Sequence, residues 1–203
     1  MGIANLFDRT IAAMLPITPR FIVKRVAARY VAGESLDEAL PVLRRIQEGG
    51  ACATLDVLGE EIHDIAEGAE AVQAYRDCLD LIHREKLDAN ISIKLTAFGL
   101  RQDADVTYER VREVVDYARS LDNFVRIDME DSSTTDATLD LYRRLRAEGF
   151  DNVGVVLQAY MRRTQADVAA LAEHRTNYRL CKGIYVEREE VAFKDFDEIN
   201  RNY

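Results

Sequence analysis

The chain has 203 residues, of which 48% are apolar and 31% charged, and its formal net charge is −9. This is an ordinary globular composition, sufficient for one domain with a sizeable core. The acidic total argues against any general affinity for nucleic acid, because binding phosphates needs a cationic surface.

The first 50 residues are expected to form an N-terminal helical segment. The pattern Ser35-Leu36-Asp37-Glu38 is a capping box that opens a helix, and this helix should end near Gly49-Gly50. The basic amphipathic stretch before it could lie on an anionic membrane. Packing on the domain, with its Lys and Arg side chains in water, is the favoured interpretation.

From residue 51 to residue 203, short apolar runs alternate with helical patterns. The expected strands are 53–59, 90–96, 124–130, 152–160 and 178–185, and the expected helices are 70–86, 108–121, 133–148 and 164–174. Such alternation predicts a parallel sheet with right-handed crossovers.

Two parallel architectures fit this alternation. A doubly wound nucleotide-binding fold usually carries a glycine fingerprint after its first strand, but Leu58-Gly59-Glu60-Glu61 holds neither G-x-G-x-x-G nor a Walker A motif. Polar residues instead collect at the carboxyl ends of the strands, where a (β/α)8 barrel builds its active site. We therefore predict an α/β TIM-type barrel that is incomplete, with about five βα units over residues 51–203.

The parity of the strands supports the barrel. In ISIKLT and VRIDME, apolar residues occupy alternate positions and should pack on outer helices, because successive side chains of a strand alternate faces. The opposite set should point to the barrel interior: Ser92, Lys94, Thr96, Arg126, Asp128 and Glu130. Charges at such positions are costly unless they are paired or used.

The predicted barrel is short of strands. Five units are fewer than the eight of a closed barrel, and the final FKDFDEINRNY reads as the start of a helix. We expect the chain to be a piece of a longer protein, or the edge of its last strand to be covered by something else.

Cysteines and histidines exclude two other kinds of site. The three cysteines are widely spaced without C-x-x-C, which fits a reducing, cytoplasmic compartment, and the histidines form no metal-binding motif. The N-terminus is no convincing secretory signal, and no uncharged apolar run approaches the ~20 residues of a membrane-spanning helix.

Five strand ends together resemble the proline dehydrogenase family, the flavoenzymes that oxidise L-proline. The matching stretches, in the family's order, are DVLGE (56–60), ISIKLT (91–96), RIDMED (126–131), VVLQAYMRR (155–163) and YRLCKGIYVE (178–187). The resemblance implies a distorted barrel that binds FAD non-covalently at the strand ends and produces 1-pyrroline-5-carboxylate. It also implies a quinone acceptor at the membrane surface, a location peripheral to the inner membrane, and pyrroline-5-carboxylate dehydrogenase as a partner.

The resemblance also assigns site residues. Lys94 would contact the substrate carboxylate and Tyr185 would form a wall of the substrate pocket. Asp128 and Arg179 would be catalytic, with Arg179 near flavin N5, where a fixed cation stabilises the electron density added by reduction. The residues that would contact the flavin are Met129, Gln158, Arg179, Lys182, Gly183 and Ile184.

One family feature is missing. The family's Tyr-x-x-Arg-Arg helix, whose arginines grip the proline carboxylate, does not occur, and Arg162-Arg163 follows the fourth strand and cannot replace it. We therefore expect the 203-residue chain alone to have little or no activity.

Two other functions fit the residues alone. An aldolase-type barrel could use Lys182 beside Arg179 as a Schiff-base nucleophile, because a second cation lowers the pKa of a lysine. A truncated, inactive barrel could act only as a binding module through its open edge.

Overall fold

The computed structural model describes residues 31–59, 62–172 and 175–203, and the chain divides into two compact units, Met1–Ala51 and Cys52–Tyr203. The helix described in the first unit is α3 (Leu36–Glu48).

The start of α3 shows one of the two hydrogen bonds of the predicted capping box, because the Glu38 carboxylate bonds the N–H of Glu34 and not that of the N-cap Ser35. The Ser35 side chain accepts a hydrogen bond from the Glu38 backbone N–H at 3.3 Å, and the Glu38 carboxylate accepts one from the Glu34 N–H at 3.0 Å. The remainder of the expected N-terminal helical segment, residues 1–30, lies outside the described residues.

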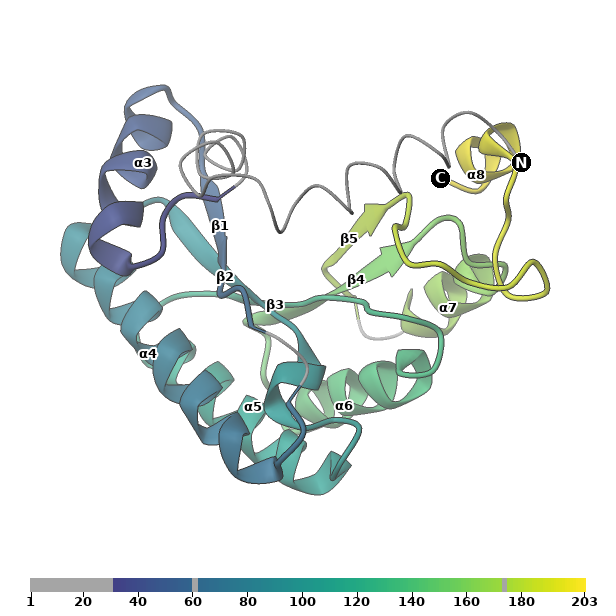
Figure 1. Ribbon diagram of the computed structural model, residues 1–203, viewed down its shortest axis with the longest axis horizontal. Coiled ribbons are helices and arrows are strands. Elements are labelled where there is room, and N and C mark those ends of the chain that lie inside the picture. Colours follow the sequence, from purple (N-terminus) through teal and green to yellow (C-terminus); the bar gives the residue numbers. More distant parts are fainter. Residues whose placement is uncertain (1–30, 60–61, 173–174) are drawn as a thin grey trace, which may run out of the picture. The chain divides into compact units, whose positions relative to one another are not determined.

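The second unit is built on a five-stranded parallel sheet whose strands follow one another in chain order. The strands are β1 (Ala53–Asp56), β2 (Ala89–Ile93), β3 (Val125–Ile127), β4 (Val153–Gln158) and β5 (Tyr178–Cys181). The sheet curls like half a barrel (Figure 1), which confirms the predicted α/β fold class.

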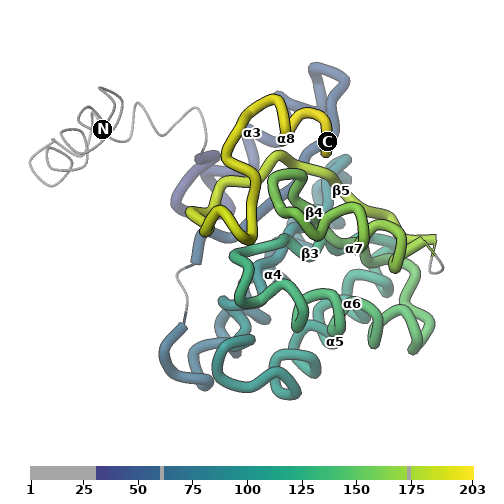
Figure 2. The backbone as a smooth tube through the Cα atoms, turned by 90° about the vertical axis from the view of Figure 1, so that its right-hand side faces the viewer, coloured from purple at the N-terminus to yellow at the C-terminus, as the bar shows by residue number. Residues whose placement is uncertain are grey.

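Helices cover the outer face of this curled sheet, as Figures 1 and 2 show. They are α4 (Gly68–Glu85), α5 (Ala104–Ser120), α6 (Thr135–Ala147) and α7 (Thr164–Leu171), with the short helices η2 (Ile65–Glu67), η3 (Leu95–Phe98) and α8 (Phe196–Asn202) between or after them. The last of these confirms the helix expected in FKDFDEINRNY.

Some element boundaries differ from those expected. Helix α5 begins earlier than Tyr108, because the Asp103 side chain accepts hydrogen bonds from the N–H groups of Asp105 and Val106, both at 2.9 Å. Strands β3 and β5 are shorter than their apolar patterns, and the polar residues that follow them, Asp128 and Lys182, line a cavity.

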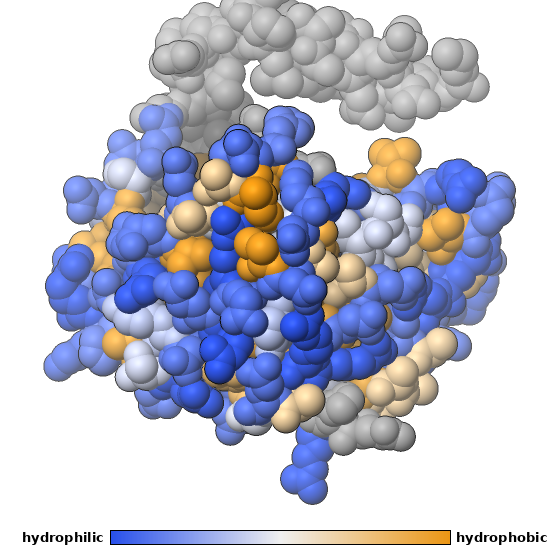
Figure 3. Space-filling view, turned by 90° about the horizontal axis from the view of Figure 1, so that it is seen from below, coloured by the Kyte–Doolittle hydropathy of each residue, from blue (hydrophilic) through white to orange (hydrophobic). Residues whose placement is uncertain are grey.

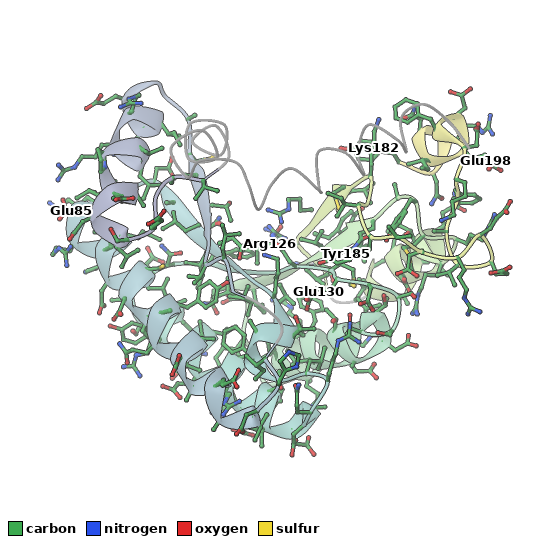
Figure 4. The ribbon with its side chains drawn as sticks, in the orientation of Figure 1. Glu85, Arg126, Glu130, Lys182, Tyr185 and Glu198 are labelled. Carbon is green, nitrogen blue, oxygen red and sulfur yellow. The ribbon has the colours of Figure 1, made fainter. Side chains whose placement is uncertain are left out.

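The predicted strand parity is confirmed within β2 and β3, whereas Met129, which was expected to pack on the helices, lines a cavity at the strand ends. Ile91 and Ile93 of β2 are fully buried on the side of the helices, as are Val125 and Ile127 of β3. Apolar burial between sheet and helices is the main favourable contribution to folding here. The alternate residues, with Arg126 among them, occupy the opposite face of the sheet (Figure 4).

Candidate active site

A cavity of about 370 Å³ lies at the carboxyl ends of the strands. Strands β4 and β5 supply residues to it, together with the segments that follow β2, β3 and β5. Every site residue expected from the sequence lines this cavity: Lys94, Asp128, Met129, Gln158, Arg179, Lys182, Gly183, Ile184 and Tyr185. The fold therefore brings together residues from four separate parts of the chain.

Asp128 and Arg179 form one side of the cavity. Arg179 Nη2 donates to Asp128 Oδ1 at 2.6 Å, and the Ser92 hydroxyl donates to the same oxygen at 2.5 Å. The Asp128 side chain is 19% exposed and that of Arg179 is 45% exposed, so the carboxylate lies deeper and the guanidinium faces the opening. A charge-assisted pair of this kind fixes the direction of the cation.

Lys94 has a carboxylate partner that the sequence analysis did not assign to it. Its ammonium group forms an ion pair with Asp56 at the end of β1. The buried Tyr75 of α4 donates its hydroxyl to the other Asp56 oxygen at 3.1 Å. Burial, with the neighbouring Asp56 charge, raises the pKa of Tyr75 far above its usual range, so the phenol keeps its proton.

The amide of Gln158 is held in one orientation. Its Nε2 donates to the backbone carbonyls of Met129 and Glu130, at 2.7 and 2.9 Å, which identifies the nitrogen. Its Oε1 is buried and has no hydrogen-bond partner among the described residues. A buried acceptor without a donor is costly, so this atom is suited to a donor from a bound ligand.

The segment after β5 forms another wall of the cavity. Gly183 has a φ of 104°, and a Cβ atom there would lie 2.1 Å from the Tyr160 ring. The absence of a side chain therefore accommodates Tyr160, a reason that the sequence did not reveal. Ile184 is 88% exposed although it lines the cavity, so the cavity is open to solvent on that side.

Lys182 reaches toward α8. Its ammonium donates to Asn200 Oδ1 at 2.6 Å and lies 4.3 Å from the centre of the Phe196 ring. Figure 4 shows Lys182 near β5, on the side of the sheet away from helices α4 to α6. Glu187 accepts hydrogen bonds from the N–H and hydroxyl of Ser132, at 2.6 and 2.7 Å.

Burial governs the titration of groups around the cavity. It raises the pKa of Glu130, although hydrogen bonds from the N–H and hydroxyl of Thr96 oppose the effect. Burial also raises the pKa of Tyr185, and the nearby carboxylates of Glu130 and Asp128 add to this. The Cys181 thiol also lines the cavity, and burial raises its pKa as well.

Sequence reasoning missed the roles of Ser92 and Asp56. Both roles have a signal in the sequence. Ser92 lies two residues before Lys94 and so points to the same face of the sheet. Asp56 is the last residue of β1, just as Lys94 is the first residue after β2. Arg162 and Arg163 do not reach the cavity. Arg163 pairs with Asp136 and Asp167, at 2.7 and 2.8 Å, and Arg162 Nε donates to a backbone carbonyl.

A larger depression of about 970 Å³ lies on the outer helices, away from the strand ends. Four of its charged side chains pair with one another, Arg76 with Glu113 at 2.8 Å and Arg144 with Asp105 at 2.9 Å. Figure 3 shows this side of the molecule as largely hydrophilic. We interpret it as the solvated outer surface of the helices.

The described part of the chain holds neither a metal-binding cluster nor a membrane-spanning helix. Over these residues, no group of His, Cys, Asp and Glu side chains could hold a metal ion. None of the helices over the same residues is both long and apolar enough to cross a membrane.

Known proteins resemble this chain over most of its length. The family model for proline dehydrogenase matches residues 39–196. Proline dehydrogenase 1 of Bacillus subtilis subsp. natto is 35% identical over 169 residues, which are 83% of this chain and 56% of that protein. Proline dehydrogenase of Deinococcus radiodurans is 34% identical over 182 residues, which are 88% of this chain and 59% of that protein.

A solved structure shares the fold. Proline utilization A from Bdellovibrio bacteriovorus, in a form inactivated by N-propargylglycine, superposes with a TM-score of 0.79 at 25% sequence identity. The match covers 89% of this chain and 23% of that one. The matched family model, the relatives and the shared half-barrel agree, and the chain belongs to the proline dehydrogenase family.

Proposed function

We propose that this chain serves a proline dehydrogenase, which oxidises L-proline to 1-pyrroline-5-carboxylate with FAD. The observation that carries the proposal is the single cavity at the strand ends, which gathers Lys94, Asp128, Gln158 and Arg179. These residues come from separate motifs that resemble the family's. Their convergence is what a common site for a flavin and an anionic substrate requires.

The cavity suits an isoalloxazine ring. Gln158 Oε1 is a buried acceptor in need of a donor, and such a ring carries an N–H group. Met129 and Ile184 offer apolar contact, while Arg179 and Lys182 offer positive charge for a reduced ring or for phosphates. Bound there, the flavin would supply the redox chemistry by taking a hydride from C5 of proline.

The protein's own residues would bind and orient. Lys94 would hold the substrate carboxylate, because a cation in a partly desolvated cavity attracts an anion strongly. Tyr185 would pack against the proline ring. Arg179, directed by Asp128, would stabilise negative charge that develops during reduction.

Lys182 is not arranged as a Schiff-base nucleophile. Its ammonium donates to Asn200 and lies over the Phe196 ring, so the group is already engaged by α8. The matched relatives support neither the aldolase-type function nor an inactive binding module.

The wider setting is part of the same proposal. A quinone at the membrane surface would reoxidise the flavin, and a pyrroline-5-carboxylate dehydrogenase would consume the product. The protein would be cytoplasmic and peripheral to the inner membrane. Residues 51–203 would form the flavin-binding catalytic part, preceded by the helical segment over residues 1–50.

Proline-dependent reduction of an artificial dye by the product of the complete gene tests this function. Lys94→Ala should raise KM for proline roughly tenfold to a hundredfold, as expected for the loss of a charged hydrogen-bond partner. Arg143→Ala is the matched control, because that cation pairs with Asp140 on the outer surface. A wild-type protein that binds no FAD, or a Lys94→Ala variant with unchanged KM, would contradict the proposal.

A further inference from the structure

Ser92 is a buried hydroxyl beneath the cavity, outside the set of residues that line it. The residue is 2% exposed and lies on β2, between the fully buried Ile91 and Ile93. Its Oγ donates to Asp128 Oδ1 at 2.5 Å, and Arg179 Nη2 donates to the same oxygen at 2.6 Å. Asp128 Oδ1 thus accepts hydrogen bonds from a residue of β2 and from a residue of β5, although β3 and β4 lie between these strands.

The strand register places this hydroxyl. Ser92 is paired with Arg126 in the β2–β3 ladder, and the Asp128 N–H donates to the Ile93 carbonyl at 2.8 Å. The backbone therefore fixes Ser92 beside the Asp128 side chain. Burying a hydroxyl is costly without a hydrogen bond, and Ser92 uses its only O–H on the carboxylate.

We propose that Ser92 is a positioning residue, which holds Asp128 and, through it, the guanidinium of Arg179 at the cavity wall. The inference rests on the proposed function in one respect, namely that this wall faces a flavin. Without the Ser92 hydroxyl, Asp128 keeps more uncompensated negative charge and Arg179 loses its fixed direction. Both changes destabilise the reduced, electron-rich ring relative to the oxidised ring, so their effects on the flavin add.

Three variants separate this role from a general effect on packing. Ser92→Ala removes the hydroxyl and almost no volume, while Ser92→Thr keeps a hydroxyl on a residue that strands favour. Ser133→Ala is the matched control. Its hydroxyl donates to Asp131 at 2.5 Å, and Arg101 binds both that carboxylate and the Ser133 hydroxyl, so the same three residue types meet outside the cavity.

The first measurement needs no cofactor. Solvent exchange of the Arg179 guanidinium protons, followed by NMR in the 203-residue chain, should become severalfold faster in Ser92→Ala. It should stay unchanged in Ser133→Ala and return toward the wild-type rate in Ser92→Thr. Unchanged exchange in Ser92→Ala would overturn the positioning role, whether or not the protein binds FAD.

The second measurement is the midpoint potential of bound FAD in the complete gene product. We expect Ser92→Ala to shift the equilibrium about tenfold toward the oxidised flavin, which for a two-electron couple is about 30 mV more negative. If Arg179 exchange becomes faster but the potential stays unchanged, the orientation of Arg179 by Asp128 does not affect the flavin, and that part of the proposal is overturned. Failure to bind FAD at all would count against the proposed function and leave the exchange result valid.

Discussion

Replacement of Gly183 by alanine should destabilise the protein by an amount that the structure allows to be divided into two parts. The φ of 104° at this residue is unfavourable for any residue with a Cβ atom, at a cost of about 1–2 kcal/mol. The added Cβ would also lie 2.1 Å from the ring of Tyr160, and overpacking of this kind costs about 1–3 kcal/mol. The expected loss is therefore about 2–5 kcal/mol.

Gly149 provides the control for the backbone part. Its φ is 87°, and a Cβ atom there would meet nothing within 4 Å. Gly149→Ala should therefore cost only the backbone part, about 1–2 kcal/mol. Urea unfolding of both variants, followed by circular dichroism, gives the two free energies of unfolding, and their difference is the cost of the contact with Tyr160.

A double variant tests the assignment of that contact. Tyr160→Leu removes the ring, so Gly183→Ala should cost less in that background than in the wild type, because the two residues touch. Equal losses in Gly183→Ala and Gly149→Ala would refute the reasoning, since they would mean that the Tyr160 ring does not occupy the space beside Gly183.

Three further predictions concern single groups around the cavity. Gln158→Met should weaken FAD binding roughly tenfold, measured by flavin fluorescence, because the orphaned acceptor is lost; unchanged affinity would contradict its role. Burial raises the pKa of Glu130, so its contribution to stability is fully present below the ordinary Glu pKa and is lost as pH rises through the raised value. As pH rises above the ordinary Glu pKa, the urea midpoint of Glu130→Gln should therefore increase relative to that of the wild type. A difference between the two midpoints that does not change with pH would contradict the raised pKa of Glu130. Tyr75→Phe keeps the ring stacked 5.6 Å from Phe98 but loses the bond to Asp56, so the free energy of unfolding should fall by about 1 kcal/mol, and no loss in thermal unfolding would contradict that.

The sequence predicted the parallel half-barrel because its signals are local and periodic. Alternation in ISIKLT and VRIDME sets which side chains face the helices, and the order of strands and helices sets the topology. Strand ends of parallel neighbours meet at one edge, so the convergence of Lys94, Asp128, Gln158 and Arg179 followed from the fold class.

Other features of the site depend on contacts between distant residues. The partner of Lys94 is Asp56, 38 positions earlier in the chain, and nothing in the local pattern of either residue specifies the pair. The link from Ser92 to Asp128 depends on the register between β2 and β3. The role of Gly183 depends on the ring of Tyr160, which lies just after the neighbouring strand β4. Such pairings become visible only when the strands are set side by side.

The ion pair between Lys94 and Asp56 has a thermodynamic consequence for any carboxylate ligand. The cation already has an anionic neighbour, so an incoming carboxylate must share Lys94 or displace Asp56. The net free energy of binding is then the attraction of Lys94 for the ligand carboxylate minus its attraction for Asp56, and these two attractions are similar. Ligand exchange of this kind favours modest affinity and ready departure of the bound carboxylate.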